Sequence, residues 1–218
     1  TKKTFKKWMM LRSFARSIFN KITITYPQNL ETAKYLKILK VDKIRHLGNL
    51  KFAENFEEDL ERINNNLKKE LKNKKMWVAS STHRNEEIFC AKAHIQLRKN
   101  IKNLITIVIP RHIHRSDEII SEIKSLGLKV LKHSSKPRSL KNTDIYIVDT
   151  FGETKKFHKI SSSVFLGGSI IDRGGQNPLE AARFGAKILH GPNTDNFKDV
   201  YKLLKSLNVS KKLIRQKN

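Results

Sequence analysis

The chain has 218 residues, 38% of them hydrophobic and 30% charged, which is enough for one or two globular domains. Its formal net charge of +25 indicates anionic partners such as nucleic acid, a lipid headgroup surface or phosphorylated substrates. The single cysteine, Cys90, excludes an internal disulfide and a thiolate metal cluster, and no apolar run is long enough to cross a bilayer.

The first fifty residues differ in pattern from the rest. The stretch "FKKWMMLRSFARSIFNKI" from Phe5 predicts an amphipathic helix. Its apolar face holds Leu11, Phe14, Ala15 and Ile18. Its basic residues are Lys6, Lys7, Arg12 and Arg16. Such a helix can lie on an anionic membrane surface, but a core helix with a solvated basic face is the commoner case, and we favour the core helix.

Short β-branched runs then alternate with helical patterns. Each run is apolar nearly throughout, as in a parallel strand covered on both faces. The runs are 22–25, 76–81, 104–110, 144–149, 163–168 and 187–192. The stretch "RINNNLKKELKNKK" from Arg62 predicts an exposed helix that leads into the sheet. This alternation predicts an α/β fold, an open and mostly parallel sheet whose ligands bind at the carboxyl ends of the strands.

The segment 167–192, "GGSIIDRGGQNPLEAARFGAKILHGP", carries the strongest binding signal. A strand ends in Gly167 and Gly168, and the following turn tolerates positive φ at Gly174 or Gly175. Asn177 is a favoured N-cap and Pro178 a favoured first residue, so we expect a helix from there to Gly185 whose start binds phosphate. Glu180 then either caps this helix or holds the hydroxyls of a bound ribose.

Three more loops end at the same edge of the predicted sheet. Arg111 follows a buried strand and can make a bidentate contact with phosphate. The stretch "DTFGET" from Asp149 is another strand followed by a glycine turn. The paired carboxylates Glu86 and Glu87 could serve as a general acid or base, although glutamates in a first helical turn usually interact with the helix dipole. The two histidines of "RHIHR" lack a third ligand at a recognisable spacing, so we set a zinc site aside.

In this order the motifs resemble those of the Kdo transferases, which attach 3-deoxy-D-manno-octulosonic acid (Kdo) to lipid A. They are "GNLKF" at Gly48, "SSTHRNEE" at Ser80, "PRH" at Pro110, "DTFGE" at Asp149, "GGSIIDRGGQNPLEAARFG" at Gly167 and "GPNTDNFKD" at Gly191. The resemblance implies the GT-B fold, two Rossmann-like domains with the active site between them. It also implies a donor activated by cytidine monophosphate (CMP), a lipid A precursor as acceptor, and work at the cytoplasmic face of the bacterial inner membrane in lipopolysaccharide synthesis.

The resemblance also assigns donor-binding residues by position. Pro110 and Arg111 are expected to contact the nucleotide. Phe151, Gly152 and Glu153 line it, and the helix start that grips it consists of Asn177, Pro178, Leu179 and Glu180. No metal or other cofactor is implied, because the helix start and the arginine take the place of a metal ion.

Four positions depart from the pattern of the family. Gln176 stands for its usual histidine, Phe151 for its methionine and Asn85 for the glycine before the paired glutamates. These three changes are tolerable. The sequence "HIH" after Arg111 stands for a more usual His-Pro-Glu, which removes a carboxylate near that arginine and could loosen its positioning.

The resemblance also predicts the domain organisation. Residues 1–50 are expected to be the tail of the N-terminal acceptor domain with the interdomain linker, and residues 51–218 the nucleotide-sugar-binding domain, cut short at its end. The glutamate that resembles the family's general base is expected upstream of Thr1. The chain alone is therefore expected to bind donor and to be inactive in transfer.

Two other functions are compatible with parts of the sequence. A helix start and a ribose-binding glutamate also suit other GT-B enzymes, such as a uridine-sugar transferase or an epimerase. The net charge alone would suit a nucleic-acid-binding protein, but the basic residues do not cluster on a recognisable reading element, so no nucleic-acid partner is expected.

Overall fold

The computed structural model describes residues 2–45 and 63–213. Residues 2–45 belong to one compact unit, called the first unit here, and residues 63–213 belong to another, the second unit. The motif at Gly48, the start of the Arg62 stretch and the expected boundary at residue 50 lie outside the described residues. No helix in the described parts of the chain is long and apolar enough to span a bilayer.

The first unit consists of three short helices. They are α1 (Lys2–Met10), α2 (Arg12–Phe19) and α3 (Leu30–Ile38). The single helix predicted from Phe5 is wrong, because the chain leaves helical geometry at Leu11, where φ is −120° and ψ is 49°. Of the predicted apolar face only Ala15 is buried, whereas Leu11 is 62% and Phe14 58% exposed. Ala15 packs in a small core with Leu36, Leu39 and Val41, and partly buried side chains that include Phe5 and Trp8 cover it, so the face that enters the core is not the predicted one.

The run 22–25 does not form a strand. Within the described residues it makes only an isolated bridge between Thr25 and Ile44. The β-branched pattern predicted a strand, but a strand needs a neighbour along its length, and the first unit supplies one only at this point.

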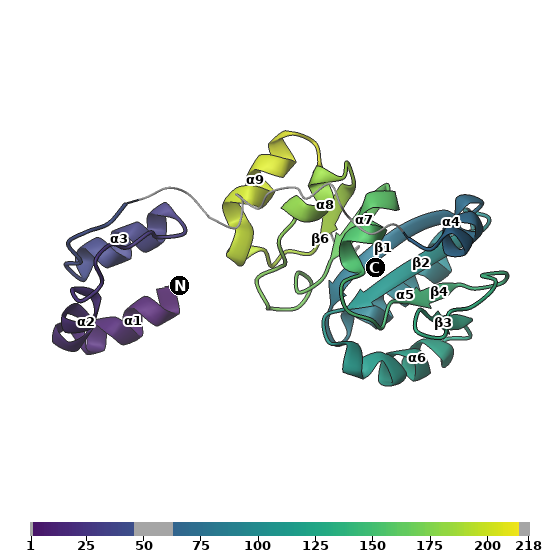
Figure 1. The fold of residues 1–218 in the computed structure, drawn as a ribbon, viewed down its shortest axis with the longest axis horizontal. Helices are drawn as coiled ribbons and strands as arrows, with labels where there is room; N and C mark the ends of the chain where they lie inside the picture. The colour runs from purple at the N-terminus through teal and green to yellow at the C-terminus, as the bar shows by residue number, and fades with distance from the viewer. Residues whose placement is uncertain (1, 46–62, 214–218) are drawn as a thin grey trace, which may run out of the picture. The chain divides into compact units, whose positions relative to one another are not determined.

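The second unit is built on one seven-stranded parallel sheet (Figure 1). Its strands are β1 (Lys75–Thr82), β2 (Leu104–Pro110), β3 (Val130–Lys132), β4 (Ile145–Ile147), β5 (Ser163–Leu166), β6 (Lys187–His190) and β7 (Ser210–Lys212). The spatial order is β3-β4-β2-β1-β5-β6-β7. The chain therefore builds outward in one direction from β1 and then in the other from β5, which places the topological switch point between the carboxyl ends of β1 and β5.

Helices cover both faces of this sheet. The long ones are α4 (Asn65–Lys72), α5 (Glu86–Leu97), α6 (Ser116–Lys124) and α9 (Lys198–Ser206). The short ones are α7 (Thr154–Ile160) and α8 (Leu179–Arg183), and single turns lie at Ile113–Arg115 and Asp195–Phe197. Strand residues alternate between the two layers: Ile105 and Ile107 pack in the core that includes α4, α7, α8 and α9. Val108 packs in the other core, with α5 and α6.

Candidate functional site

A pocket of about 350 Å³ lies at the switch point of the sheet. It is lined by Ser80, Ser81, Arg111, Gly152, Thr154, Lys155, His158, Leu166, Gln176, Asn177 and Glu180. These residues come from the carboxyl ends of β1, β2 and β5, from α7 with the loop before it, and from the start of α8. The pocket therefore stands where ligands bind in open α/β sheets.

Two cationic side chains line this pocket. Arg111 follows β2 directly, and its backbone N–H donates to the carbonyl of Thr82 at 2.9 Å, which fixes the start of its side chain against β1. Lys155 comes from the first turn of α7. Both side chains are exposed to solvent, so both can turn toward an anion in the pocket.

The start of α8 forms much as the sequence predicts. The Asn177 Oδ1 accepts from the backbone N–H of Leu179 at 3.1 Å, as an N-cap side chain does, and Pro178 is already helical with φ −83° and ψ −13°. The regular helix is shorter than predicted, because it ends at Arg183 and the chain then turns at Gly185 with φ +81°. Since the Leu179 amide is already bonded, any phosphate in the pocket depends chiefly on the two cations.

Glu180 takes part in a chain of polar contacts across the pocket. Its Oε1 lies 3.1 Å from Nδ1 of His158, and Nε2 of His158 lies 3.0 Å from Oγ of Ser80. The hydrogen bond from His158 lowers the pKa of Glu180 below its usual range, although burial opposes the shift. Glu180 is therefore an ionised carboxylate facing the two cations.

The other predicted residues lie beside the pocket. Pro110 is buried as the last residue of β2, and Phe151 is 84% exposed. Glu153 points to Nζ of Lys156, at 2.9 Å, and to Nε2 of His133, at 3.8 Å. Of the nine residues predicted to bind the donor, the pocket brings together Arg111, Gly152, Asn177 and Glu180.

Glu86 and Glu87 are fully buried. The carboxylate of Glu86 accepts from the backbone N–H of His83 at 3.0 Å. It also accepts from Gly168 at 2.7 Å, Ser169 at 3.1 Å and Ile170 at 3.0 Å, which fastens the loop after β5 to α5. This use of Glu86 differs from both alternatives raised by the sequence.

Glu87 forms an ion pair with Arg115 at 3.1 Å. Burial raises the pKa of its carboxyl, and Arg115 opposes that shift. Because neither Glu86 nor Glu87 reaches the pocket, the structure assigns both a structural use.

Backbone geometry keeps the tips of β1 and β5 close together. Ser81, which lines the pocket, has φ +54° and sits where the register between β1 and β2 shifts. A Cβ added at Gly167 would lie 2.3 Å from the carbonyl oxygen of Ser81, so only glycine fits there. The positive φ predicted in the following turn is confirmed at Gly174, with +75°, and at Gly175, with +72°.

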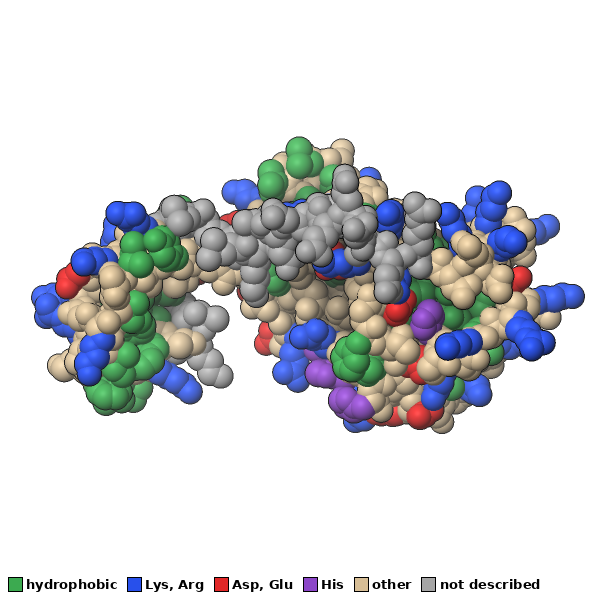
Figure 2. Space-filling view, in the orientation of Figure 1, with side chains coloured by type: hydrophobic (Ala, Val, Ile, Leu, Met, Phe, Trp, Pro, Cys, Tyr) green, Lys and Arg blue, Asp and Glu red, His purple; other side chains and the backbone are tan. Residues whose placement is uncertain are grey.

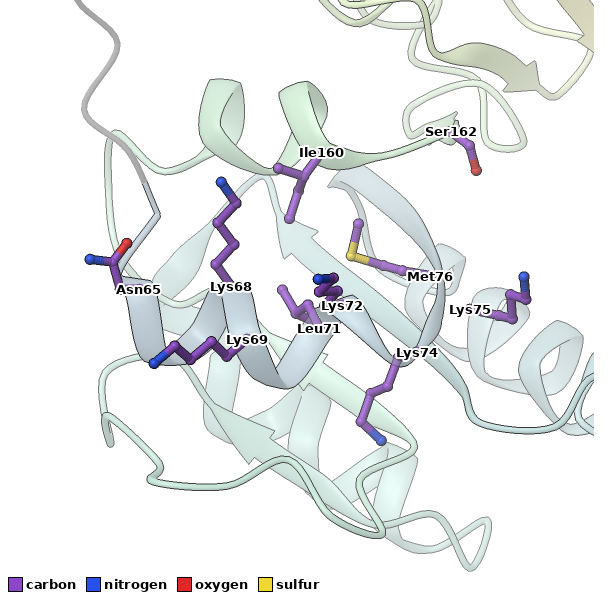
Figure 3. Close-up of a pocket in the computed structure, with 10 residues that line it drawn as sticks. All are labelled: Asn65, Lys68, Lys69, Leu71, Lys72, Lys74, Lys75, Met76, Ile160 and Ser162. Carbon is purple, nitrogen blue, oxygen red and sulfur yellow. The ribbon is translucent and has the colours of Figure 1, made fainter.

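A larger hollow lies at the opposite edge of the sheet (Figure 3). It measures about 690 Å³ and is called the lysine groove here. Its lining residues are Asn65, Lys68, Lys69, Leu71, Lys72, Lys74, Lys75, Met76, Ile160 and Ser162. The lining has no carboxylate, because Glu70 of α4 instead accepts from Ser139 Oγ at 2.9 Å and from the Leu140 amide at 2.7 Å.

Together, the parallel sheet, its two helical layers and the pocket at its switch point define the second unit as a Rossmann-like α/β domain of a GT-B protein. Its fold is similar to the crystal structure titled the C-terminal CMP-Kdo binding domain of WaaA from Acinetobacter baumannii. The TM-score is 0.60 and the sequence identity 30%, over 66% of this chain and 75% of that one.

The sequence comparisons lead to the family. Residues 1–54 match the family described as 3-deoxy-D-manno-octulosonic-acid transferase (kdotransferase). The chain is 35% identical over 207 residues to the 3-deoxy-D-manno-octulosonic acid transferase of Rickettsia felis, and 27% identical over 197 residues to that of Haemophilus influenzae. These alignments cover 92% and 89% of this chain but 43% and 46% of the relatives, so the chain spans less than half of their length. The chain belongs to the Kdo transferase family, which confirms the resemblance found in the sequence.

Several lining residues were missed by the sequence analysis. Lys155 follows the "DTFGE" motif by two positions, and its basic character next to a phosphate-binding loop was the available signal. His158 and Ser80 gave no such signal, because they are 78 positions apart and meet only when α7 packs on β1. Within the described residues no group of three histidine, cysteine or acidic side chains is arranged to hold a metal ion.

Proposed function

We propose that the second unit binds CMP-activated Kdo in the pocket at the switch point. We also propose that the protein to which this chain belongs transfers Kdo from that donor to a lipid A precursor. The observation that carries the proposal is the arrangement of charge: Arg111 and Lys155 line the same 350 Å³ pocket as the ionised Glu180. The names of the relatives and of the A. baumannii domain agree with this chemistry.

The two kinds of charge suit the two parts of a nucleotide. Arg111 and Lys155 would bind the phosphate, since guanidinium and ammonium groups form charge-assisted hydrogen bonds with its oxygens. Glu180 would accept hydrogen bonds from the ribose hydroxyls, because an ionised carboxylate only accepts.

Transfer in the intact protein would proceed by displacement at the anomeric carbon of Kdo. A general base removes the proton of a lipid A hydroxyl, the oxygen attacks that carbon, and the bond to the phosphate oxygen breaks. CMP leaves with the bonding electrons, and Arg111 and Lys155 stabilise the charge that develops on its phosphate. Glu86 and Glu87 are buried and bonded, so we place the base in the part of the acceptor domain that precedes this chain.

The first unit would then be the tail of that acceptor domain and would face the lipid. Met10, at 84% exposed, Leu11 and Phe14 are open to solvent. Figure 2 shows hydrophobic side chains on the surface of this unit. The exposed Lys6 and Lys7 lie on α1. We propose that this surface binds the anionic cytoplasmic face of the bacterial inner membrane.

Calorimetry with free nucleotides tests the donor assignment. CMP should bind the chain more tightly than uridine monophosphate or inorganic phosphate, since only CMP matches the base, ribose and phosphate of the donor. Tighter binding of uridine monophosphate would favour a uridine-sugar enzyme instead. Absence of nucleotide binding, together with DNA binding that falls steeply with salt, would favour a nucleic-acid-binding protein.

Vesicle sedimentation tests the membrane assignment. The chain should sediment with vesicles containing phosphatidylglycerol, less so with neutral vesicles, and less as salt rises, because exposed charges are screened. The variant Phe14→Ser should weaken the association, whereas Leu203→Ser, which changes another exposed apolar residue on α9, should not. Equal sedimentation with neutral vesicles would contradict a basic membrane-binding surface.

A further inference from the structure

His158 is the most unusual side chain near the pocket. It belongs to α7, is only 3% exposed, and contacts polar groups of two other elements, Ser80 of β1 and Glu180 of α8. Its neighbour Phe157 is fully buried and provides the apolar packing of this helix. A buried position that needed only volume would be filled by an apolar ring, so the polar contacts of His158 call for a separate explanation.

The two contacts fix the protons on the imidazole ring. The carboxylate of Glu180 is ionised and can only accept, and it lies 3.1 Å from Nδ1 of His158, so we assign the ring hydrogen to Nδ1. With the ring hydrogen on Nδ1, Nε2 accepts the hydroxyl hydrogen of Ser80 over 3.0 Å. The hydroxyl of Ser80 thus orients the ring of His158, and that ring orients one carboxylate oxygen of Glu180.

The other carboxylate oxygen of Glu180 remains for the pocket. Both residues line the cavity, but the side chain of Glu180 is 31% exposed whereas that of His158 is only 3% exposed. A glutamate side chain has several rotatable bonds, and one that is held at Oε1 presents Oε2 in a fixed direction. Preorganisation of this kind raises affinity because less rotational freedom is lost on binding.

We infer that His158 is a positioning residue: held by Ser80, it orients Glu180 to receive the ribose hydroxyls of the donor nucleotide. This inference rests on the proposed function, because it takes the ligand of the pocket to be a ribonucleotide. It adds that ribose recognition depends on a histidine that need not touch the ligand. It also separates two parts of the pocket, since the cations that would bind the phosphate are not in this chain of contacts.

The ratio of two affinities isolates ribose recognition. CMP and 2′,3′-dideoxycytidine monophosphate share base and phosphate and differ only in the two hydroxyls. Calorimetry on the wild-type chain should show CMP bound about tenfold more tightly, the effect of hydrogen bonds to a charged group. In His158→Phe this ratio should fall toward one, through weaker binding of CMP and unchanged binding of the dideoxy nucleotide.

Two amide variants distinguish positioning from packing. In His158→Asn the amide nitrogen replaces Nδ1 and can still donate to Glu180, so most of the ratio should be retained. In His158→Gln the amide reaches toward Ser80 instead, so the ratio should fall as in His158→Phe. Phe157→Leu is the matched control on the same helix, and it should lower thermal stability without changing the ratio.

The outcomes separate the two proposals. If the wild type binds no CMP, the proposed function fails and the inference with it. If CMP binds but the wild-type ratio is one, or the ratio survives in His158→Phe and His158→Gln, the inference is overturned and the proposed function stands. If His158→Phe does not fold, Ser80→Ala gives the same test, because it frees the ring while leaving Glu180 in place.

Discussion

The pocket at the switch point and the lysine groove are both positively charged, yet they differ in how the charge is held. The groove has five lysines, from α4, the turn after it and the start of β1, together with the apolar Leu71, Met76 and Ile160. The smaller pocket has two cations, and it sets them together with a carboxylate whose direction is fixed by a buried histidine. Volume and charge would favour the groove as a ligand site, but opposed polar groups held in place are what recognise one ligand.

The largest expected effect concerns the difference between binding and transfer. The pocket lies within the second unit and should bind CMP in this chain alone. Transfer needs a base within hydrogen-bond reach of the acceptor, and neither Glu86 nor Glu87 can supply it. Incubating the chain with CMP-Kdo and a lipid A precursor should give no product above background, as judged by mass spectrometry.

Fusion to the N-terminal domain of a family member should restore product. Turnover by the chain alone would contradict our placement of the base outside it. Glu86→Gln and Glu87→Gln would then be the first variants to measure.

The next prediction compares the loss of one cation from the pocket at the switch point with the loss of one cation from the lysine groove. Arg111→Ala removes a charge-assisted hydrogen bond to phosphate, worth about 1.5–3 kcal/mol, so CMP should bind roughly 10- to 100-fold more weakly in calorimetry. Lys72→Ala removes a cation from the groove and should leave CMP affinity unchanged. Equal affinity of Arg111→Ala and wild type would show that the phosphate lies elsewhere.

A smaller effect concerns the groove itself. If its lysines act only as screened surface charges, they should bind a polyanion such as heparin, with an affinity that falls as salt rises. In Lys69→Gln/Lys72→Gln the slope of log affinity against log salt should decrease by about 2, one for each lost contact. A slope that stays the same would mean that the polyanion binds another basic surface of this chain.

The smallest effect is a change in the pKa of Glu180. The His158 hydrogen bond lowers this pKa, so the carboxylate stabilises the fold above the usual glutamate range, and that stability is lost as pH falls through the lowered value. In His158→Phe the bond is gone while burial, which raises the pKa, and the charge of Lys155 remain. Carbon-13 NMR of labelled glutamate carboxyls, assigned with Glu180→Gln, should show the midpoint moving to higher pH. A midpoint that does not move would mean that His158 does not stabilise the ionised form.

The central strands of the sheet could be predicted from the sequence, whereas its two outer strands could not. The apolar runs at 76–81, 104–110, 144–149, 163–168 and 187–192 all contain strands, because central strands must be apolar on both faces. The short outer strands β3 and β7 were missed: Ser210–Lys212 is polar, since an edge strand faces solvent on one side. In the other direction, the run 22–25 has the composition of a strand but lacks a partner along its length.

The site was predictable where local chemistry determined it. Asn177, Pro178 and Gly174 follow from capping and turn preferences, and Arg111 follows from its position after a buried strand. His158 could not be found in this way, because a histidine within a lysine-rich helix has no local pattern. Its contacts depend on tertiary packing between elements that are distant in the sequence.

The buried carboxylate of Glu86 has a consequence for hydrogen exchange. The amides of Gly168, Ser169 and Ile170 belong to a loop, where backbone hydrogens ordinarily exchange with solvent within the time of local fluctuations. Here all three amides donate to the fully buried carboxylate of Glu86. Their hydrogens should therefore exchange only when α5 separates from the sheet. These three amides should therefore retain their protons as long as those of the central strands do, which would make the start of this loop as resistant to opening as the sheet to which it is fastened.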